Sequence, residues 1–461
     1  MAPPLEAALA YASAHFEDSL AELTALVEIP SVSSDKEDRR PMHDAAEWLA
    51  SRLRGASLPR VEVFPTVANP IVFAERTAPG ARPPVVLIYG HYDVHSPEPR
   101  QAWATEPFRA VAGGDRLYAR GASDMKGQIV ACLLAVEAVL AAGPYPVTLK
   151  FLLEGNEEFG PSPIGDFIRD HKELLQCDFC FSADAGMIGE RSPTIVYGLR
   201  GRSNCVIRVS GPADDVHDGV FGGVILNPIH VLSKMIAGFH DADGRVAIPG
   251  FYDKVREIRE DERAELARLP KNDAYYLKNS GAPALWGERG YPAVERAATR
   301  PSLNILQVRA GGPSSAIPSS AEADVTARLV PDQDPTEFHE QLTRYVEANT
   351  PEAVTSEVRL VGGYRPTLTD RSSPAVVALS RALEETWGTR PLFDRIGAGI
   401  PVVGKLQDLL GVDSVLTGFS LPEDNIHGPN ESVHLPTLRR GVEALVRFLL
   451  HIAEQQSGQP V

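Results

Sequence analysis

Cysteine is scarce in this sequence, with four residues among 461. A disulfide framework requires a denser set, so the cysteine content is typical of a reducing compartment, and we expect a cytoplasmic protein. Cys177 and Cys180 form a single C-x-x-C. Because a redox or metal role for such a pair requires a second pair or a thioredoxin-like context, we interpret both as packing residues.

Long apolar runs and an excess of basic residues are also missing. No segment approaches the roughly 18 consecutive apolar residues of a membrane helix. The first twenty residues contain acids and lack a basic leader followed by an apolar stretch, so we predict no signal peptide. The net charge of −16 argues against binding to nucleic acid or to an anionic membrane surface. We therefore expect neither nucleic acid nor membrane as a partner.

The chain is long enough for more than one hydrophobic core, which rarely extends beyond about 250–300 residues. Apolar runs at 85–89, 147–153 and 179–184 are typical of strands buried on both faces. A helical pattern at 125–143 separates the first two. Such alternation predicts an α/β fold with a mixed, largely parallel sheet flanked by helices.

The pattern changes in the middle of the chain. Segments 205–211 and 322–330 alternate apolar and polar residues, which indicates a half-exposed sheet with helices on one face. The charged segment 253–269 is interpreted as a solvated surface helix. Buried α/β patterns return after about residue 365. We therefore predict an α+β domain at 204–364, inserted into a catalytic domain formed by 1–203 and 365–461.

Residues with metal-binding side chains follow the predicted buried strands. They are His91 and Asp93 after 85–90, Asp124 before the helix at 125–143, Glu157 and Glu158 after 147–153, Asp184 after 179–183, and His427 after 414–419. Taken singly, each has an ordinary explanation, and Asp124 could simply cap its helix. Ligands gather at the carboxyl ends of strands in such sheets, and clustered acids require a cation to be tolerated. Together they predict a metal site.

The types of ligand restrict which metals and which mechanisms are possible. Imidazole and carboxylate without thiolate suit zinc or manganese better than magnesium or calcium. A site for two ions needs one shared carboxylate, which leaves one of Glu157 and Glu158 free as a general base. Asp93, two residues past His91, is placed to accept the ring N–H of that histidine and to orient it.

Seven motifs occur along the chain in a characteristic order. They are "GHYDV" (90–94), "GASDMKG" (121–127), "EGNEEFG" (154–160), "SADAGM" (182–187), "DVHDGVFGG" (215–223), "RLVPDQDP" (328–335) and "NIHGPNE" (425–431). In this respect the sequence resembles the co-catalytic zinc metallopeptidases that include carnosine-type dipeptidases, glutamate carboxypeptidase, aminoacylase and acetylornithine deacetylase. The resemblance extends from about residue 20 to 450 and is closest to the dipeptidase branch.

The resemblance implies a role for each matching residue. His91, Asp124 and Asp184 hold one divalent ion, zinc by expectation with manganese or cobalt as alternatives. Asp124, Glu158 and His427 hold the second. Glu157 is the general base that activates a water held between the ions. The inserted domain acts as a lid and forms a homodimer, in which His217 reaches the partner's site to stabilise the oxyanion.

The resemblance also concerns the substrate. It implies that Arg328 grips a substrate carboxylate and that Asn304 is a polar lid residue. Two departures from the family pattern are present: Asp218 stands where serine follows the lid histidine, and Ala398 and Gly399 replace the glycine and serine of "GGSIP". Because that serine commonly contacts the carboxylate end of the substrate, its absence affects the expected specificity.

Three functions remain open from the sequence. The first is a dipeptidase, and the second is an N-acyl-amino-acid deacylase or related amidohydrolase. The third is a non-catalytic metal-binding protein on the same fold. The filled ligand set and the spare glutamate favour an enzyme, with a small peptide or N-acyl amino acid as its substrate.

Overall fold

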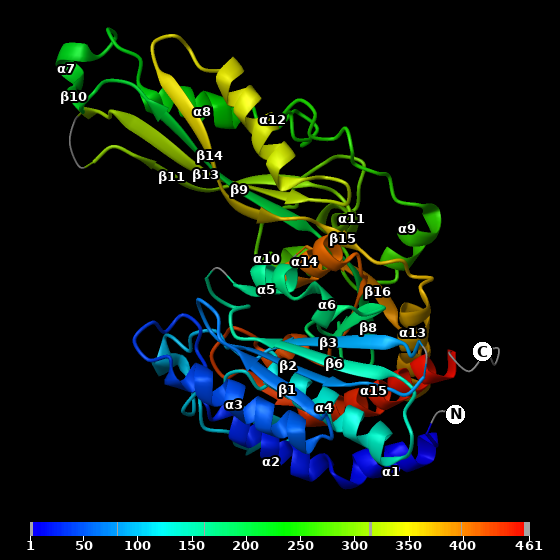
Figure 1. Cartoon of the computed structure of the whole chain (residues 1–461). Helices are drawn as coiled ribbons and strands as arrows, with labels where there is room; N and C mark the ends of the chain where they lie inside the picture. Colours follow the sequence, from blue (N-terminus) through cyan, green and yellow to red (C-terminus); the bar gives the residue numbers. More distant parts are fainter. Residues whose placement is uncertain (1–2, 81, 161, 313–315, 398, 456–461) are drawn as a thin grey trace. The chain divides into compact units, whose positions relative to one another are not determined.

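The computed structural model describes residues 3–80, 82–160, 162–312, 316–397 and 399–455 (Figure 1). The chain divides into two compact units. Unit 1 comprises 1–197, 369–393 and 405–461, and unit 2 comprises 198–368 and 394–404. Within the described ranges, no helix combines the length and the apolar character that crossing a membrane requires.

Unit 1 is built on a mixed sheet with the strand order β1-β2-β6-β3-β7-β17-β8-β15, in which β16 also pairs with β8. In the chain, β8 and β16 each contain a unit boundary, and β15 belongs to unit 2. The strands are β1 (Arg60–Phe64), β2 (Ile71–Arg76), β3 (Val85–His91), β6 (Thr148–Glu154), β7 (Phe179–Ser182), β8 (Thr194–Leu199), β15 (Thr367–Leu368), β16 (Leu392–Ile396) and β17 (Ser414–Leu416).

The centre of this sheet is parallel. β3 pairs in parallel with both β6 and β7, and β7 pairs in parallel with β17. The flanking strands β1, β2 and β8 are antiparallel to their neighbours. β6 is buried along its whole length and β3 along nearly all of it, as expected for strands covered on both faces. The predicted mixed α/β fold is thus confirmed, and its parallel part brings four carboxyl ends to one edge.

Helices cover both faces of this sheet (Figure 1). Helices α1 to α4 lie along one face, and α5 and α6 along the other. α4 packs against α1, α2 and α15, which explains why 13 of its residues are buried. The helices are α1 (Leu5–Ala14), α2 (Phe16–Val27), α3 (Arg40–Gly55), α4 (Lys126–Ala141), α5 (Ile164–Asp170), α6 (Lys172–Leu175), α13 (Pro374–Trp387), α14 (Pro401–Leu410) and α15 (Leu435–Gln455).

A small antiparallel sheet accompanies the main sheet of unit 1. It consists of β4 (Val111–Gly113), β5 (Arg116–Tyr118) and β18 (Ser432–His434), in the order β18-β5-β4. Two short 3₁₀ turns, η1 (Arg100–Ala102) and η2 (Pro422–Asp424), precede β4 and β18 along the chain. Pairing of β5 with β18 connects the segment before Asp124 to the segment after His427.

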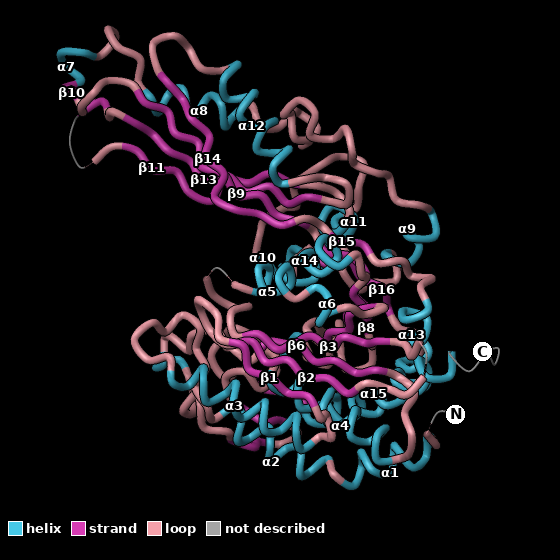
Figure 2. Tube along the Cα trace, viewed as in Figure 1, coloured by secondary structure: helices cyan, strands magenta, loops and turns pink. Residues whose placement is uncertain are grey.

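Unit 2 is a four-stranded antiparallel sheet with helices on one face (Figure 2). The strand order is β11-β13-β9-β14, and α8 and α12 pack against the sheet. The elements are β9 (Gly201–Ser210), β10 (Val216–His217), α7 (Asp218–Phe221), α8 (Pro228–Ala237), α9 (Glu260–Leu266), α10 (Asp273–Ser280), α11 (Ala293–Ala298), β11 (Ser302–Ala310), β12 (Ala316–Ile317), β13 (Ser320–Leu329), α12 (Pro335–Ala348) and β14 (Thr355–Tyr364).

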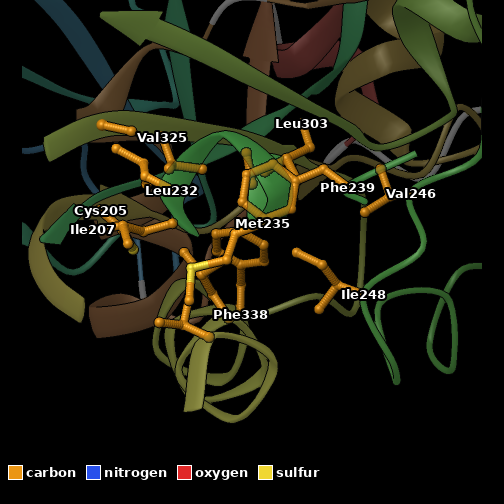
Figure 3. Close-up of a cluster of buried hydrophobic side chains, with 14 of the residues drawn as sticks. Cys205, Ile207, Leu232, Met235, Phe239, Val246, Ile248, Leu303, Val325 and Phe338 are labelled. Carbon is orange, nitrogen blue, oxygen red and sulfur yellow. The ribbon is translucent and has the colours of Figure 1, made fainter. Parts of the chain in front are cut away.

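The core of unit 2 lies between this sheet and its helices. Met235 and Leu232 of α8 and Phe338 of α12 meet the buried strand residues Ile207 and Val325 (Figure 3). Along β9 and β13, buried positions alternate with partly exposed ones. The other face of the sheet is therefore polar, as alternation in the sequence predicts.

One local expectation needs correction. The predicted helix at 253–269 is present only as α9, Glu260–Leu266, whose first turn carries three acids that favour a helix N-terminus. Leu266 is fully buried, so α9 is not a purely solvated surface helix. Unit 2 comprises Gly198–Leu368 and Asp394–Gly404, and the sequence predicts the inserted domain at 204–364. β9 pairs with β14 from Arg202 and Tyr364 to Ser210 and Thr355, with a register shift between Leu360 and Gly362.

Candidate metal centre

Four of the five predicted ligand segments follow central strands of the main sheet. His91 is the last residue of β3, Glu158 follows β6, Asp184 follows β7, and His427 lies on the long segment after β17. Because these strands are parallel, their carboxyl ends share one edge. Asp124 follows β5 of the small sheet and reaches the same edge from the turn that precedes α4, the helix before which the sequence analysis places it.

His91, Asp124 and Asp184 form the first ligand group. Nε2 of His91 lies 3.1 Å from Oδ1 of Asp124 and 3.5 Å from Oδ1 of Asp184. One ligand atom from each residue lies within 4.8 Å of the others. His91 is 1% exposed, and both carboxylates are largely buried. The group thus offers one nitrogen and two oxygens to a common point.

Asp124, Glu158 and His427 form the second group. Nε2 of His427 lies 3.0 Å from Oδ2 of Asp124 and 2.9 Å from Oε2 of Glu158. The ring of His95 stacks on His427 at a centroid distance of 4.8 Å. Asp124 therefore faces His91 with one oxygen and His427 with the other. Met125, rather than Asp124, occupies the N-cap position of α4, so the helix-cap explanation does not apply.

Asp93 supports both groups through its main chain and its carboxylate. Its carbonyl oxygen lies 3.0 Å from Nδ1 of His91, whereas its carboxylate is 3.5 Å from that nitrogen. The two carboxylate oxygens instead accept the backbone N–H groups of Glu157 and Glu158. Asp93 is fully buried and therefore fixes the turn that carries the two glutamates. The carbonyl, more than the predicted carboxylate, orients the His91 ring.

Glu157 lies beside the two groups but belongs to neither. Burial raises its pKa to about 8, helped by the nearby carboxylates of Asp184, Glu158 and Asp124 and opposed by His91. Adjacent residues at this turn therefore differ: Glu158 contributes a ligand atom to the second group, and the Glu157 side chain stays outside both.

The pKa values of the candidate ligands indicate whether a cation fits among them. Burial raises the pKa of Asp184 to about 6. Hydrogen bonds to Asp124 and Glu158 raise the pKa of His427 to about 10. Asp124 is an exception, because burial raises its pKa but hydrogen bonds from His427 and His91 outweigh this and hold the pKa well below its ordinary value. Asp184 thus tends to hold a proton, and His427 stays protonated only because acids surround it. A divalent cation among them would reverse both tendencies, so the imidazole and carboxylate donors fit one.

A buried carboxylate that the sequence analysis did not single out connects the loops that carry the ligands. Glu431 is 1% exposed, and its side chain accepts hydrogen bonds from Arg120 and from the N–H groups of Gly121, Ser123 and Asp124. It lies four residues after His427, inside the motif "NIHGPNE". The position of Glu431 inside this motif could have marked it as a functional residue. Only the fold shows that its side chain bonds to the loop of Asp124.

A second carboxylate strengthens this connection. Asp424 is fully buried and accepts hydrogen bonds from Ser123 Oγ at 2.7 Å and from Arg116 Nη1 at 2.6 Å. Its Oδ2 also accepts the N–H of Leu421. Segments 116–124 and 421–431 are therefore held together by two buried acids.

The predicted substrate and lid residues all belong to unit 2. Arg328 lies on β13, and Asn304 lies exposed on β11. His217 ends β10, is 69% exposed, and its ring accepts a hydrogen bond from the N–H of Gly219. Asp218, also exposed, begins α7. Ala398 lies outside the described residues, so only Gly399 of that departure is characterised.

The cysteines of the C-x-x-C are free thiols. Cys180 is fully buried, and burial raises the pKa of Cys177 to about 12. Such thiols stay protonated at neutral pH and are poor nucleophiles and ligands. Their environment is that of packing residues.

Comparison with known proteins now identifies the family. The model of Peptidase family M20/M25/M40 matches residues 87–451, well over half of the chain. The chain belongs to this peptidase family. The matched span contains both ligand groups, Glu157 and the Glu431 network.

Individual relatives and structures agree with this assignment. The Cys-Gly metallodipeptidase DUG1 of Saccharomyces cerevisiae is 26% identical over 94% of this chain and 95% of the yeast protein. The human Beta-Ala-His dipeptidase is 27% identical over 84% of this chain and 78% of the human protein. The crystal structure of the M20 family metallo-carboxypeptidase Sso-CP2 from Sulfolobus solfataricus superposes with a TM-score of 0.84, at 29% identity, over 95% of this chain and 99% of that one.

These findings confirm the resemblance inferred from the motifs, including its position near the dipeptidase branch. The predicted class, a metal-dependent hydrolase of the peptidase type, is confirmed with it. Membership in this family implies divalent metal ions, for which the described residues provide two candidate groups.

Proposed function

We propose that the protein is a dipeptidase that hydrolyses its substrates with the help of two divalent ions. The observation that carries the proposal is the pair of ligand groups that share Asp124, with Glu157 beside them and outside both. The names of the two dipeptidase relatives support the substrate class.

We assign the candidate residues two roles, which are to hold the ions and to keep the ligand loops in place. His91, Asp124 and Asp184 would hold one ion, and Asp124, Glu158 and His427 the other, with zinc as the proposed metal and manganese or cobalt as alternatives. Ions held there lower the pKa of water and polarise a carbonyl oxygen. Asp93 and Glu431 keep the ligand loops in place through the hydrogen bonds described above.

Glu157 is the proposed general base. It takes a proton from the attacking water, whose oxygen forms a bond to the carbonyl carbon of the scissile amide. When the C–N bond breaks, Glu157 returns this proton to the leaving amine. Its side chain is free for this purpose because the ligand positions are filled by Glu158 and its neighbours.

Unit 2 is proposed to bind the substrate and a second copy of the chain. Arg328 would grip the carboxylate of the substrate, with Asn304 as a polar neighbour. His217 would act in the site of the partner subunit by stabilising the oxyanion. Exposed apolar side chains in unit 2 support a homodimer interface there: Val220, Phe221 and Val224 near His217, and Leu306 and Val308 on the edge strand β11.

The substitution Glu157→Gln tests the catalytic proposal. We expect metal content to persist while kcat falls by about 10²- to 10⁴-fold, since the base is lost and the ligands remain. Metal analysis of the purified protein and dipeptide hydrolysis before and after chelation provide the measurements. The exposed Glu423→Gln is the matched control. Near wild-type turnover in the Glu157→Gln protein would show that the base is another group.

The alternative is an N-acyl-amino-acid deacylase, which the departure at Gly399 favours. A panel of dipeptides and N-acyl amino acids separates the two, because a dipeptidase releases two amino acids and a deacylase releases an acid and one amino acid. A cytoplasmic location completes the proposal, supported by four cysteines that are all free thiols.

A further inference from the structure

Three arginines gather at one end of the polar face of the unit 2 sheet. Arg328 of β13 pairs directly with Arg202 of β9, which pairs in turn with Tyr364 of β14. Directly paired residues of antiparallel strands point to the same face. Arg200 lies just before β9, and burial together with the charge of Arg328 lowers the pKa of Arg200 to about 10.

None of these three guanidinium groups forms an ion pair within the described part of the chain. Arg328 donates to the hydroxyl of Tyr364 at 3.2 Å, Arg202 to Oδ1 of Asn204 at 2.8 Å, and Arg200 to the carbonyl of Arg300 at 3.4 Å. Nε of Arg200 is buried and has no hydrogen-bond partner. Each of these guanidinium groups therefore has donors that no carboxylate of the described residues accepts.

Other arginines of the same unit are neutralised. Arg309 pairs with Asp324 at 2.6 Å, Arg365 with Asp334 at 2.5 Å, and Arg300 with Glu288 at 2.7 Å. In a chain with 61 acids and 45 basic residues, partners are abundant. Three adjacent cations without a carboxylate therefore need another source of negative charge, because like charges repel and arginine does not lose its proton.

Two glycines make room for this arrangement. A Cβ at position 397 would lie 2.6 Å from Nη2 of Arg200. A Cβ at position 399 would lie 2.8 Å from the hydroxyl of Tyr364 and closer still to its ring. Gly399 is thus what allows the Tyr364 ring to sit there, with its hydroxyl bonded to Arg328.

A cavity adjoins the cluster. Its volume is about 270 Å³, and Arg200, Ser302 and Asn304 contribute to its wall together with the apolar side chains of Leu303 and Trp286. Arg300 also lines it but is already paired with Glu288. Of the three arginines of the cluster, only Arg200 lines this cavity, and its space is sufficient for one amino-acid side chain.

We propose that Arg200, Arg202 and Arg328 with Tyr364 form a subsite for two carboxylates, so that the enzyme prefers substrates with an acidic C-terminal residue. The inference rests on the proposed function, in which Arg328 takes the terminal carboxylate. Guanidinium groups bind carboxylates through paired, charge-assisted hydrogen bonds. One terminal carboxylate offsets one cation, and the carboxylate of a glutamate or aspartate side chain offsets a second, facing Arg202.

The test compares Ala-Glu with Ala-Gln, which differ in charge but hardly in size. We expect kcat/KM for Ala-Glu to exceed that for Ala-Gln by about 10-fold or more in the wild type. The reason is that a site built to bind a charged carboxylate discriminates against an analogue that lacks the charge. The ratio should fall to near one in Arg202→Met. Both substrates are measured on one preparation, so the ratio does not depend on how much enzyme is folded.

Arg309→Met, on the same sheet but paired with Asp324, is the control and should keep the wild-type ratio. Calorimetric binding of Ala-Glu and Ala-Gln to the metal-loaded Glu157→Gln protein makes the test independent of turnover. A wild-type ratio near one, or a preference that survives Arg202→Met, would overturn the subsite and leave the dipeptidase intact. If no dipeptide is hydrolysed, the proposed function fails, and calorimetry with N-acetylglutamate and N-acetylglutamine decides the subsite alone.

Discussion

Glu431 illustrates how a single buried residue supports a metal centre without contributing a ligand atom. Its carboxylate pairs with Arg120 at 2.7 Å and accepts three backbone N–H groups of the turn that ends in Asp124. Both members of the pair are at most 2% exposed. Removing one charge of such a pair leaves the other buried and uncompensated.

Glu431→Gln should therefore lower both stability and metal affinity. We expect a loss of about 3–5 kcal/mol in the free energy of unfolding from the broken buried pair. Metal affinity should fall by about 10- to 100-fold, the usual effect of losing a residue that orients ligands. Chemical denaturation and competitive metal titration measure the two effects. The exposed Glu423→Gln, on the same segment, should change neither, and equal metal affinity in both variants would contradict the positioning role.

At the scale of elements, strand direction decides where the ligands meet. The apolar runs predicted the central strands well: 85–89, 147–153 and 179–184 correspond to β3, β6 and β7. These runs do not predict which strands are neighbours in the sheet. Asp124 shows the limit, because it follows a strand of a different small sheet and still reaches the edge formed by β3, β6, β7 and β17.

Helix α12 provides a test of how unit 2 is stabilised. Phe338 is 2% exposed and belongs to the core between α12, α8 and the sheet. Phe338→Ala should cost about 3–5 kcal/mol, because a large buried side chain leaves a cavity. Hydrogen exchange in α12 and β9 should accelerate markedly, since these elements share the core. Val361→Ala, 57% exposed on β14, is the control. Unchanged exchange in α12 would mean that the core of unit 2 does not depend on Phe338.

At the scale of the whole molecule, the proposed homodimer determines how each active site is completed. Unit 2 presents exposed apolar side chains near His217 and on the edge strand β11, and an edge strand is a ready template for pairing with another chain. The proposed dimer would make each active site depend on a residue from the other copy.

Co-expression of two inactive variants tests this dependence. Glu157→Gln and His217→Ala should each be nearly inactive as pure dimers. If His217 acts in the partner's site, a mixture should regain about a quarter of the wild-type activity, because half of randomly assorted dimers are mixed and each holds one intact site. Light scattering of the wild type should give the mass of a dimer. A fully active monomer, or a mixture with no recovered activity, would exclude the role across subunits.

Local motifs are sufficient to specify the chemistry of the metal centre. Residue types and their order along the chain are enough to predict imidazole and carboxylate ligands, a spare glutamate and the peptidase family, since these depend on local motifs. The tertiary structure decided which atoms face one another. Pairing of Arg202 with Arg328, the room that Gly399 leaves for Tyr364, and the bonds from Glu431 to a turn more than 300 residues away depend on sheet register and packing, which no local pattern encodes.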